Sequence, residues 1–492
     1  MSQTHVAPPS LGTLPNVART ASASATTLIV VGETATPAPW VADAKWQAAL
    51  PGAGSVLALG LEACHQAQAH CQRHPQAVWT GIRLPGERYP EPCPPGLSKV
   101  LPLDTLVGDS VAELAEVMPA VDLLVLSPAW VALPGASALL ARLSHLCTPG
   151  ARLVLALDNA ASFEHLSHLL QGDQTPEGVG ADPAQALALQ APATAYKALM
   201  DAGWMPHMVD HHRSPAASPS LERAVREAAQ AAGVGSGCMD VVYRMRRLII
   251  SAQRSLAHAP REAGPARFTV VVPTTEERQL RANVEASPGL AEVQARIVSC
   301  RQAVNPAQAL AQSLPHCDTD WILLAHQDVY FAQGFGEQLN AVLASIPPEQ
   351  RRQTLIGFIG MAVHPDTHQP VPAGHVIDRL HQADHAASDS ALSLDEVAVV
   401  LSRDSLHQID PAQGWHLWAT DLCLTAIAEH RVFARILRLP LFHNSRTGWN
   451  LPAAFVQGAE RLMAKHPGFV PIHTLCGQLD AGFLARQRQA TH

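Results

Sequence analysis

Short apolar runs alternate with longer amphipathic stretches from Thr27 to about His212. The apolar runs have the length and the flanking turn residues of buried strands, and they are "TTLIVVG", "GSVLALG", "AVWTGIRL", "VDLLVLSP" and "GARLVLALDN". Helical patterns such as "ASALLARLSHLC" lie between them. Strands that alternate with helices are typical of a parallel sheet covered by helices, so residues 27–212 are predicted to form an α/β domain.

A second α/β pattern begins at Phe268, and its predicted strands are "RFTVVVPT", "ARIVSC", "DWILLAHQD" and "TLIGFIGMAV". We assign residues 266–492 to this second domain. The intervening residues 213–265 are predicted to be a helical linker region, with a helix in "PSLERAVREAAQAAG", a basic and apolar stretch "YRMRRLIISAQRSL" and a Pro/Gly break "APREAGPA". Residues 1–26 are rich in Ser, Thr, Ala and Pro, and we expect them to be disordered or loosely ordered.

Composition narrows the class of protein. The 492 residues are 47% hydrophobic and 15% charged, which indicates a globular protein of two or three domains. A net charge of -8 argues against a dedicated nucleic-acid binder. No apolar run approaches the ~20 residues of a membrane span, and no secretory signal is recognised. Nine cysteines without framework spacing suit a reducing compartment, so a cytoplasmic location is expected.

The stretch "SVLALGLEACHQAQAHC", Ser55 to Cys71, places a glycine turn after a strand, where a helix N-terminus can hold a cofactor. The order of elements over residues 50 to 210 resembles class I S-adenosylmethionine-dependent methyltransferases. Of that family's glycine-rich motif only Gly60 remains, and Arg83 stands where a ribose-binding carboxylate is expected. The resemblance implies a methyltransferase-like domain. Because of these departures, we expect the domain to be non-catalytic and S-adenosylmethionine to be an unlikely ligand. An active methyltransferase acting on a glycan is the alternative.

Two histidine-containing clusters in this domain raise the question of a metal. One comprises Cys64, His70, Cys71 and His74, and the other is "VDHHR", Val209 to Arg213. Neither has the paired cysteine spacing of a zinc site, so we interpret them as a helix face and a solvated loop.

The segment "DWILLAHQDVYF" places His326 and Asp328 directly after an apolar strand. Because the two residues are two positions apart, their side chains project the same way from an extended chain. A transferase that releases a diphosphate commonly neutralises it with a divalent cation held at a strand end by carboxylate or imidazole groups. Two ordinary roles compete with this one: Asp328 could cap a turn, and His326 could satisfy a buried backbone group.

Residues 266 to 477 resemble the GT-A glycosyltransferases, family two in the broad sense. The resemblance rests on "RFTVVVPTTEERQLRANVEAS", on "HQDVYF" in the D-x-D position, on "GWHLWATDLCLTA" and on "LPLFHNSRTGWN". It implies a GT-A fold, a nucleotide diphospho-sugar donor and a metal. The sequence departs from the family pattern at His326, which replaces an acidic residue, and at Thr420, where a glutamate is frequent.

The resemblance also implies roles for individual residues. Asp421 would be the catalytic base, and Asp328, His443 and His326 would hold the metal. Pro273, Thr274, Glu276 and Asp328 would bind the nucleotide sugar. Asp395, Glu396, Trp415 and His416 would line the acceptor or sugar pocket, although a solvated strand start and ordinary aromatic packing explain them equally well. His375 and Asp378 are expected in a mobile loop of open role.

The sequence thus predicts an α/β protein with two Rossmann-like domains, the second a GT-A transferase. The predicted activity is Mn²⁺- or Mg²⁺-dependent, inverting transfer of a sugar to a glycan or protein hydroxyl, as in bacterial surface polysaccharide biosynthesis or protein glycosylation. Expected partners are the nucleotide sugar and its acceptor, with no nucleic acid and no membrane span; a peripheral association with glycan assembly machinery and a homo-oligomer stay open. The alternatives are a non-catalytic nucleotide-sugar or glycan-binding scaffold and an active methyltransferase.

Overall fold

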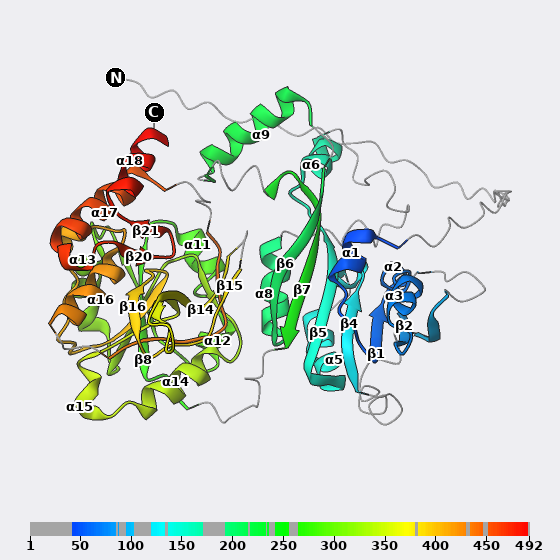
Figure 1. Ribbon diagram of the computed structural model, residues 1–492, viewed down its shortest axis with the longest axis horizontal. Coiled ribbons are helices and arrows are strands. Elements are labelled where there is room, and N and C mark those ends of the chain that lie inside the picture. Colours follow the sequence, from blue (N-terminus) through cyan, green and yellow to red (C-terminus); the bar gives the residue numbers. More distant parts are fainter. Residues whose placement is uncertain are drawn as a thin grey trace, which may run out of the picture. The chain divides into compact units, whose positions relative to one another are not determined.

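The computed structural model (Figure 1) describes most of the chain from residue 42 onward. The described residues are 42–84, 87, 95–102, 120–132, 136–170, 192–214, 217–232, 234–235, 242–254, 264–378, 382–429, 433–445 and 451–490. The expectations for residues 1–26, for "TTLIVVG" and for most of the linker "APREAGPA" lie outside these ranges. No helix among the described residues is long and apolar enough to cross a membrane.

A seven-stranded sheet organises the N-terminal part, in the order β3-β2-β1-β4-β5-β7-β6. Its strands are β1 (Ser55–Leu59), β2 (Val78–Arg83), β3 (Leu97–Pro102), β4 (Val121–Leu126), β5 (Cys147–Asp158), β6 (Trp204–Arg213) and β7 (Met245–Arg254). β1 to β5 pair in parallel, whereas β7 is antiparallel to both of its neighbours. The strand order reverses between β1 and β4, which is where open α/β sheets bind ligands.

Helices cover both faces of this sheet. The helices of this part of the chain are α1 (Ala44–Ala49), α2 (Leu61–Cys64), α3 (Ala67–Arg73), α5 (Ala136–Leu143), α6 (Phe163–Leu170), α8 (Pro192–Asp201) and α9 (Pro219–Ala231), with 3₁₀ turns at Pro128–Ala132 and Ser144–Leu146. Leu57 packs with Leu140 of α5 and Leu199 of α8 in one core. Its neighbour Val56 packs with Trp46 of α1 on the other face. Successive residues of a strand point to opposite faces, so fully apolar strands need helices on both sides.

The predicted strands that fall among the described residues of this domain are confirmed as β1, β2, β4 and β5. Two interpretations were wrong. "YRMRRLIISAQRSL" contains β7, which lies inside the sheet and not in a linker, and "VDHHR" belongs to β6 and not to a loop. β7 pairs with β5 and β6 in antiparallel fashion, and β5 is far from β7 in sequence. This long-range pairing decides that the segment is a strand, and the local sequence of the segment does not indicate it.

The C-terminal part contains two larger sheets and a hairpin. The first sheet has the order β18-β12-β17-β10-β8-β9, and the second has the order β11-β19-β14-β13-β16 with β15 beside β14. The strands are β8 (Phe268–Thr274), β9 (Ile297–Arg301), β10 (Trp321–Ala325), β11 (Val329–Phe331), β12 (Thr354–Gly357), β13 (Ile359–Val363), β14 (Pro370–Asp378), β15 (Gln382–Asp384), β16 (Ala391–Leu394), β17 (Ala398–Ser402), β18 (Phe433–Ile436), β19 (Leu441–His443), β20 (Ile472–Thr474) and β21 (Gly477–Leu479). The helices are α11 (Glu277–Ala282), α12 (Pro288–Ala291), α13 (Pro306–Ser313), α14 (Phe335–Ser345), α15 (Pro348–Arg351), α16 (Trp418–Ala428), α17 (Ala453–Lys465) and α18 (Ala481–Ala490).

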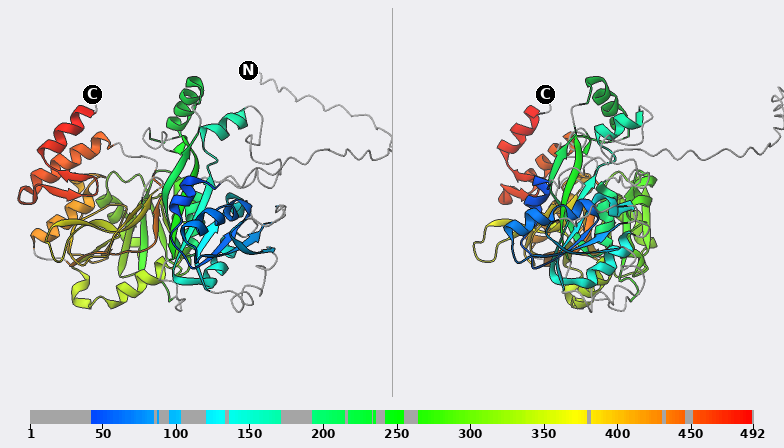
Figure 2. Two further views of the ribbon diagram at one scale, coloured as in Figure 1. Left: turned by 45° about the vertical axis from the view of Figure 1, so that its right-hand side comes forward. Right: turned by 90° about the vertical axis from the view of Figure 1, so that its right-hand side faces the viewer.

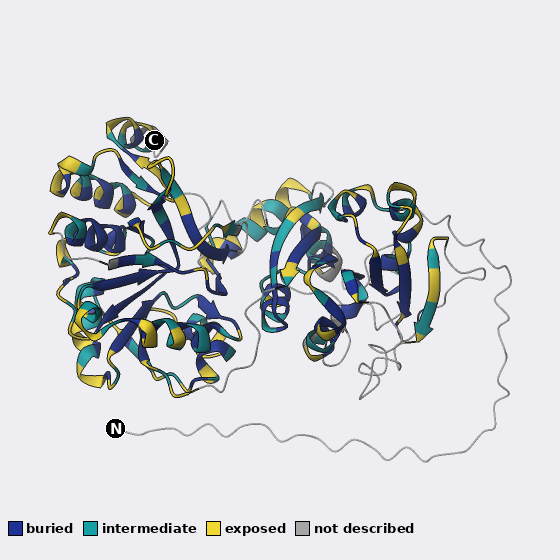
Figure 3. Ribbon diagram, turned by 60° about the horizontal axis from the view of Figure 1, so that its bottom comes forward, coloured by how far each residue is buried: buried dark blue, intermediate teal, exposed yellow. Residues whose placement is uncertain are grey.

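The first of these sheets is also buried on both faces. Val270 of β8 packs with Phe335 and Leu339 of α14, whereas Val271 packs with Trp418 and Leu422 of α16. Colouring by burial shows the same distribution, with buried residues along the strands and exposed residues on the outer helices (Figure 3). Near the C-terminus, α17 and α18 lie side by side (Figure 2). Phe455 and Phe483 belong to the hydrophobic cluster between them.

The predicted strands "RFTVVVPT", "ARIVSC" and "DWILLAHQD" are confirmed as β8, β9 and β10. "TLIGFIGMAV" is not one strand: it divides at the buried Phe358 into β12 and β13, which belong to different sheets. Gly360 lets β13 approach β16 closely, because a Cβ there would lie 2.2 Å from the carbonyl oxygen of Ser393.

A candidate metal centre where β10 and β19 end

Three side chains capable of binding a metal converge in the C-terminal part. Donor atoms of His326, Asp328 and His443 all lie within 4.8 Å of one another. His326 and Asp328 follow β10, and His443 ends β19, where it pairs with Val329 at the start of β11. No other group of three such side chains is found among the described residues.

Backbone hydrogen bonds fix the segment that carries these side chains. The N–H of His326 donates to the carbonyl oxygen of Val397 at 3.1 Å, and the N–H of Asn444 donates to the carbonyl oxygen of Asp328 at 2.8 Å. The side chain between the two candidate ligands has its own role: Oε1 of Gln327 accepts the N–H groups of Thr275 and Glu276, each at 2.9 Å. Gln327 joins the end of β8 to the end of β10, and it was not among the functional residues predicted from the sequence.

His443 lies between two carboxylates. Its Nε2 is 3.5 Å from Oδ1 of Asp328, and its Nδ1 is 3.3 Å from Oδ2 of Asp378. Burial alone would lower the pKa of His443, but the two carboxylates raise it well above its usual value. Burial would likewise raise the pKa of Asp328, yet His443 holds it well below its usual range.

The donor set tests whether a metal fits this site. Two imidazoles with one carboxylate suit Zn²⁺, Fe²⁺ or Co²⁺, whereas Mg²⁺ prefers oxygen ligands throughout. Burial lowers the pKa of His326, which favours the neutral imidazole that a metal needs, whereas at His443 a metal would have to displace the proton that the two carboxylates favour. Asp378 stands behind His443 as the carboxylate that commonly orients a metal-binding histidine. The residues therefore fit a divalent cation.

Asp395 and Glu396 form an acidic pair between β16 and β17. Burial, reinforced by the Glu396 carboxylate, raises the pKa of Asp395 to about 7. Burial acts in the same sense on Glu396, but His416 and His326 lower its pKa below the ordinary value. Nδ1 of His416 is 3.9 Å from Oε1 of Glu396, so the predicted pocket residues Glu396 and His416 are neighbours. Trp415, which precedes His416 in sequence, is 38% exposed.

Asp421 lies in a different environment. It is 1% exposed, its Oδ1 is 2.8 Å from Nε2 of His466, and its Oδ2 accepts from Nζ of Lys465 at 2.8 Å. Both carboxylate oxygens are therefore engaged between α16 and the end of α17. The adjacent Thr420 donates its hydroxyl hydrogen to the carbonyl oxygen of Leu394 at 2.9 Å. The structure groups Asp421 with His466 and Lys465, not with the three candidate metal ligands.

The remaining predicted residues lie at or near strand ends. Pro273 and Thr274 end β8, and Thr274 donates its hydroxyl hydrogen to the carbonyl oxygen of Val272 at 3.0 Å. Glu276 precedes α11. The expectation of a mobile loop at His375 and Asp378 was wrong, because both belong to β14.

Polar side chains also lie in the N-terminal sheet where the strand order reverses, between β1 and β4. Gly60 has a φ of 88°, and a Cβ there would lie 2.1 Å from Oγ of Ser127, which follows β4. The Ser127 hydroxyl is buried and has no hydrogen-bond partner in the part of the chain that the structure describes. The Glu87 carboxylate accepts the N–H groups of Leu61 at 2.8 Å and Leu84 at 2.9 Å. Gly60 was recognised in the sequence, whereas Ser127 and Glu87 were not.

In the cysteine and histidine cluster of α2 and α3, both ring nitrogens of His70 are engaged in contacts within the fold. Nε2 of His70 is 2.9 Å from the carbonyl oxygen of Pro51, and its Nδ1 accepts from Trp79 Nε1 at 3.2 Å. Cys64 is buried in the core. The interpretation as a packed helix face agrees with these contacts.

No protein-family model matches the chain, and no curated protein matches it. Similar solved structures include human N-acetylserotonin methyltransferase in complex with SAM, at 14% identity and a TM-score of 0.23, covering 43% of this chain and 51% of that one. A SAM-dependent methyltransferase from Mesorhizobium loti is 15% identical with a TM-score of 0.25, covering 42% and 95%. A plantazolicin methyltransferase in complex with SAH is 14% identical with a TM-score of 0.26, covering 43% and 79%.

These neighbours are SAM-dependent methyltransferases, and they match the N-terminal part of this chain. The chain spans about half the length of the human enzyme. At these identities and TM-scores the likeness assigns no activity, and what those proteins bind is a property of those proteins. The fold supported is mixed α/β with a methyltransferase-like, Rossmann-like N-terminal part; a GT-A domain is not confirmed.

The comparisons contradict two expectations from the sequence. The similar solved structures named above are methyltransferases, which contradicts the predicted glycosyltransferase; only the coarse class of transferase is consistent with them. Neighbours hold SAM or SAH, which conflicts with the expectation that S-adenosylmethionine is an unlikely ligand and that a nucleotide sugar is the donor.

Proposed function

We propose that this chain is a metal-dependent transferase whose C-terminal part binds a divalent cation through His326, Asp328 and His443. The observation that carries this proposal is the convergence of three donor groups within 4.8 Å, from two strand ends far apart in sequence. A carboxylate behind one of the ligands, Asp378, supports it further because such a partner orients the imidazole.

When bound, the cation would supply positive charge to anionic oxygens of a substrate. The chain's own residues orient the ligands and handle the proton. Asp378 holds the ring of His443, and Gln327 anchors the segment between His326 and Asp328 to the end of β8. Asp395, with its pKa near 7, is suited to hold or release a proton at working pH.

Metal binding is tested on the full chain after treatment with a chelator. Titration with Co²⁺, followed by visible absorption, and with Zn²⁺, followed by calorimetry, should show one saturable site. Asp328→Ala and His443→Ala should lose it, and His316→Ala, which removes an exposed imidazole of the same part, should keep it. Equal affinity in all four proteins would overturn the proposal.

A substrate class can then be sought by thermal shift. Compounds with phosphate, diphosphate or carboxylate groups should raise the melting temperature of the metal-loaded protein more than that of the chelated protein. The same compounds should have no metal-dependent effect on Asp328→Ala. An equal rise in the melting temperature of the metal-loaded and the chelated protein would mean that the substrate binds elsewhere.

Methyl transfer by the N-terminal part is a second candidate function. The observation that favours it is the buried, unpartnered Ser127 hydroxyl beside Gly60, where the strand order reverses. An unsatisfied buried polar group calls for a partner, and a ligand at this edge would provide one. Calorimetry of the full chain with S-adenosylhomocysteine should show binding that weakens about tenfold in Ser127→Ala, at ~1.4 kcal/mol for one hydrogen bond, and not in Ser220→Ala. No heat up to millimolar ligand would exclude this candidate.

A further inference from the structure

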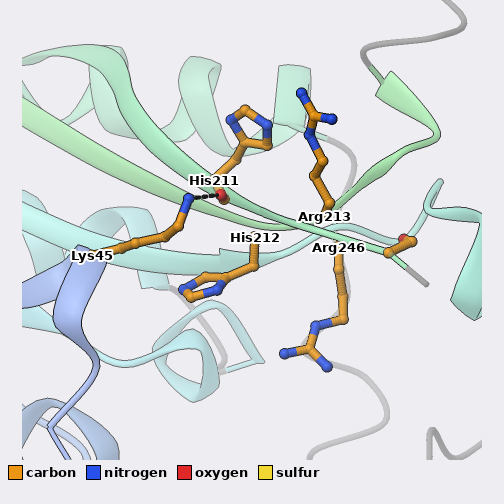
Figure 4. Close-up of a pocket in the computed structure, with 6 residues that line it drawn as sticks. Lys45, His211, His212, Arg213 and Arg246 are labelled. Atoms are coloured by element: carbon orange, nitrogen blue, oxygen red, sulfur yellow. Dashed lines mark hydrogen bonds between the residues drawn. The ribbon is translucent and has the colours of Figure 1, made fainter. Parts of the chain in front are cut away.

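A pocket of ≈ 550 Å³ lies in the N-terminal part, on residues that neither candidate function uses. It is lined by Lys45, His211, His212, Arg213, Ser214 and Arg246 (Figure 4). Three of these side chains are permanently cationic and two are imidazoles, so every lining side chain except that of Ser214 is basic. From the sequence, part of this lining, "VDHHR", was interpreted as a solvated loop and not as a metal cluster.

Three elements bring these groups together. Lys45 comes from α1, His211 to Arg213 end the edge strand β6, and Arg246 comes from β7. Figure 4 shows Lys45 reaching across to the end of β6, where its Nζ donates to the carbonyl oxygen of His211 at 2.6 Å. The same Nζ is 2.8 Å from Oδ1 of Asp210. Lys45 is thereby held in one position although its side chain is 41% exposed.

Three carboxylates lie beside the lining, as many as its permanently cationic side chains, but none of them pairs with Arg213. Lys45 pairs with Asp210, His212 pairs with Asp43 at 2.8 Å, and Nε of Arg246 lies 3.7 Å from Glu164. Arg213 is exposed, and among the described residues no carboxylate lies within ion-pair distance of its guanidinium. A guanidinium presents donors in a planar fork that matches carboxylate and phosphate oxygens.

Basic residues on an edge strand also have an ordinary explanation, because charge discourages pairing with another chain. That explanation does not account for Ser214. Its hydroxyl oxygen is buried and has no hydrogen-bond partner among the described residues, although Ser214 lines the pocket. An unsatisfied hydroxyl among cationic donors is what a bound oxyanion would complete.

We propose that this pocket binds the phosphate or diphosphate group of a small soluble ligand. Arg213 and Lys45 supply charge, and the Ser214 hydroxyl and the histidine rings supply further donors. The pocket has the volume of a site for a small molecule, larger than a lone inorganic ion needs. The chemistry would equally fit a phosphate on a lipid headgroup, and the experiment separates these two sources.

The test is calorimetric titration of the full chain with inorganic pyrophosphate, in the presence of a chelator so that the candidate metal centre takes no part. Wild-type protein should bind it saturably. Arg213→Gln and Ser214→Ala should each weaken binding at least fivefold, and Arg223→Gln, which removes an exposed arginine of α9, should leave it unchanged. Circular dichroism confirms that each variant is folded; should Arg213→Gln not fold, Arg246→Gln replaces it with the same expected loss.

Absence of binding up to millimolar pyrophosphate would overturn the proposal, as would equal weakening by Arg223→Gln. A parallel arm uses vesicles of phosphatidylcholine with a fifth of phosphatidic acid. Sedimentation with these vesicles, without binding of soluble pyrophosphate, would assign the pocket to a membrane surface and would also overturn the proposal.

Discussion

Nδ1 of His443 lies 3.3 Å from the carboxylate of Asp378, while Nε2 of the same ring lies 3.5 Å from Asp328. One nitrogen of the ring is therefore assigned to an orienting carboxylate and the other faces the candidate ligands. This arrangement follows from register, because Asp378 of β14 pairs with His443 of β19 in a parallel ladder.

Asp378→Asn should weaken Zn²⁺ binding by about 10- to 100-fold without abolishing it, since removal of an orienting partner has effects of that size. The asparagine keeps the shape and a hydrogen bond but removes the charge. Calorimetry of the chelated full chain measures the change, with Asp366→Asn, an exposed aspartate of the same part, as the control. Unchanged affinity in Asp378→Asn would mean that the carboxylate does not act on the metal.

Gln327→Ala should loosen the connection between β8 and β10 and have little effect on the global fold. The variant loses the acceptor of two N–H groups on partly exposed backbone, at about 1 kcal/mol for each hydrogen bond. Hydrogen exchange should become faster at Thr275 and Glu276, with the melting temperature changed by only a few degrees. Unaltered protection at both amides would contradict the role assigned to Gln327.

Asp421→Asn should destabilise the protein by about 3 kcal/mol, because it leaves His466 and Lys465 without their shared buried carboxylate. Urea unfolding measures this loss. Asp389→Asn, which breaks an exposed pair with Arg435, should cost less than ~1 kcal/mol. If Asp421→Asn proved neutral to stability, the carboxylate would have to be free for another purpose, such as the base role inferred from the sequence.

The stability of the fold should fall as the pH rises through neutrality on account of Asp395. Its folded pKa of about 7 lies above the ordinary value, so the folded state favours the protonated acid. The contribution is complete below the unfolded pKa, near 4, and is lost as pH rises through 7. Asp395→Asn should therefore gain stability relative to wild type between pH 4 and pH 8, by more than ~1 kcal/mol. Parallel urea titrations at the two pH values measure the gain, and a constant difference would contradict the raised pKa.

Much of the sheet architecture and the key polar cluster could be predicted from local pattern. β1, β8 and β10 are short apolar runs with turn residues at their ends, and His326 and Asp328 follow such a run directly. His443 was joined to them through a resemblance, and the structure brings the three together.

The parts that could not be predicted depend on pairing over long distances. β7 carries basic residues that resemble a linker, and only its position between β5 and β6 makes it a strand. Lys465 and His466 lie 44 and 45 positions from Asp421, so their contacts with it have no local signal. The apolar run "TLIGFIGMAV" likewise divides at Phe358 because its two halves pair in different sheets, which the run itself does not indicate.

The hydrogen bond from Asn444 to the carbonyl of Asp328 joins two points that a long stretch of chain separates. A cation shared by Asp328 and His443 would tie the same two points, and so would close that loop as a crosslink does. Closing a long loop restricts the unfolded chain far more than the folded one. Metal would then act on the lifetime of the fold as well as on a substrate, and the chelated protein would be the form that proteases cut first.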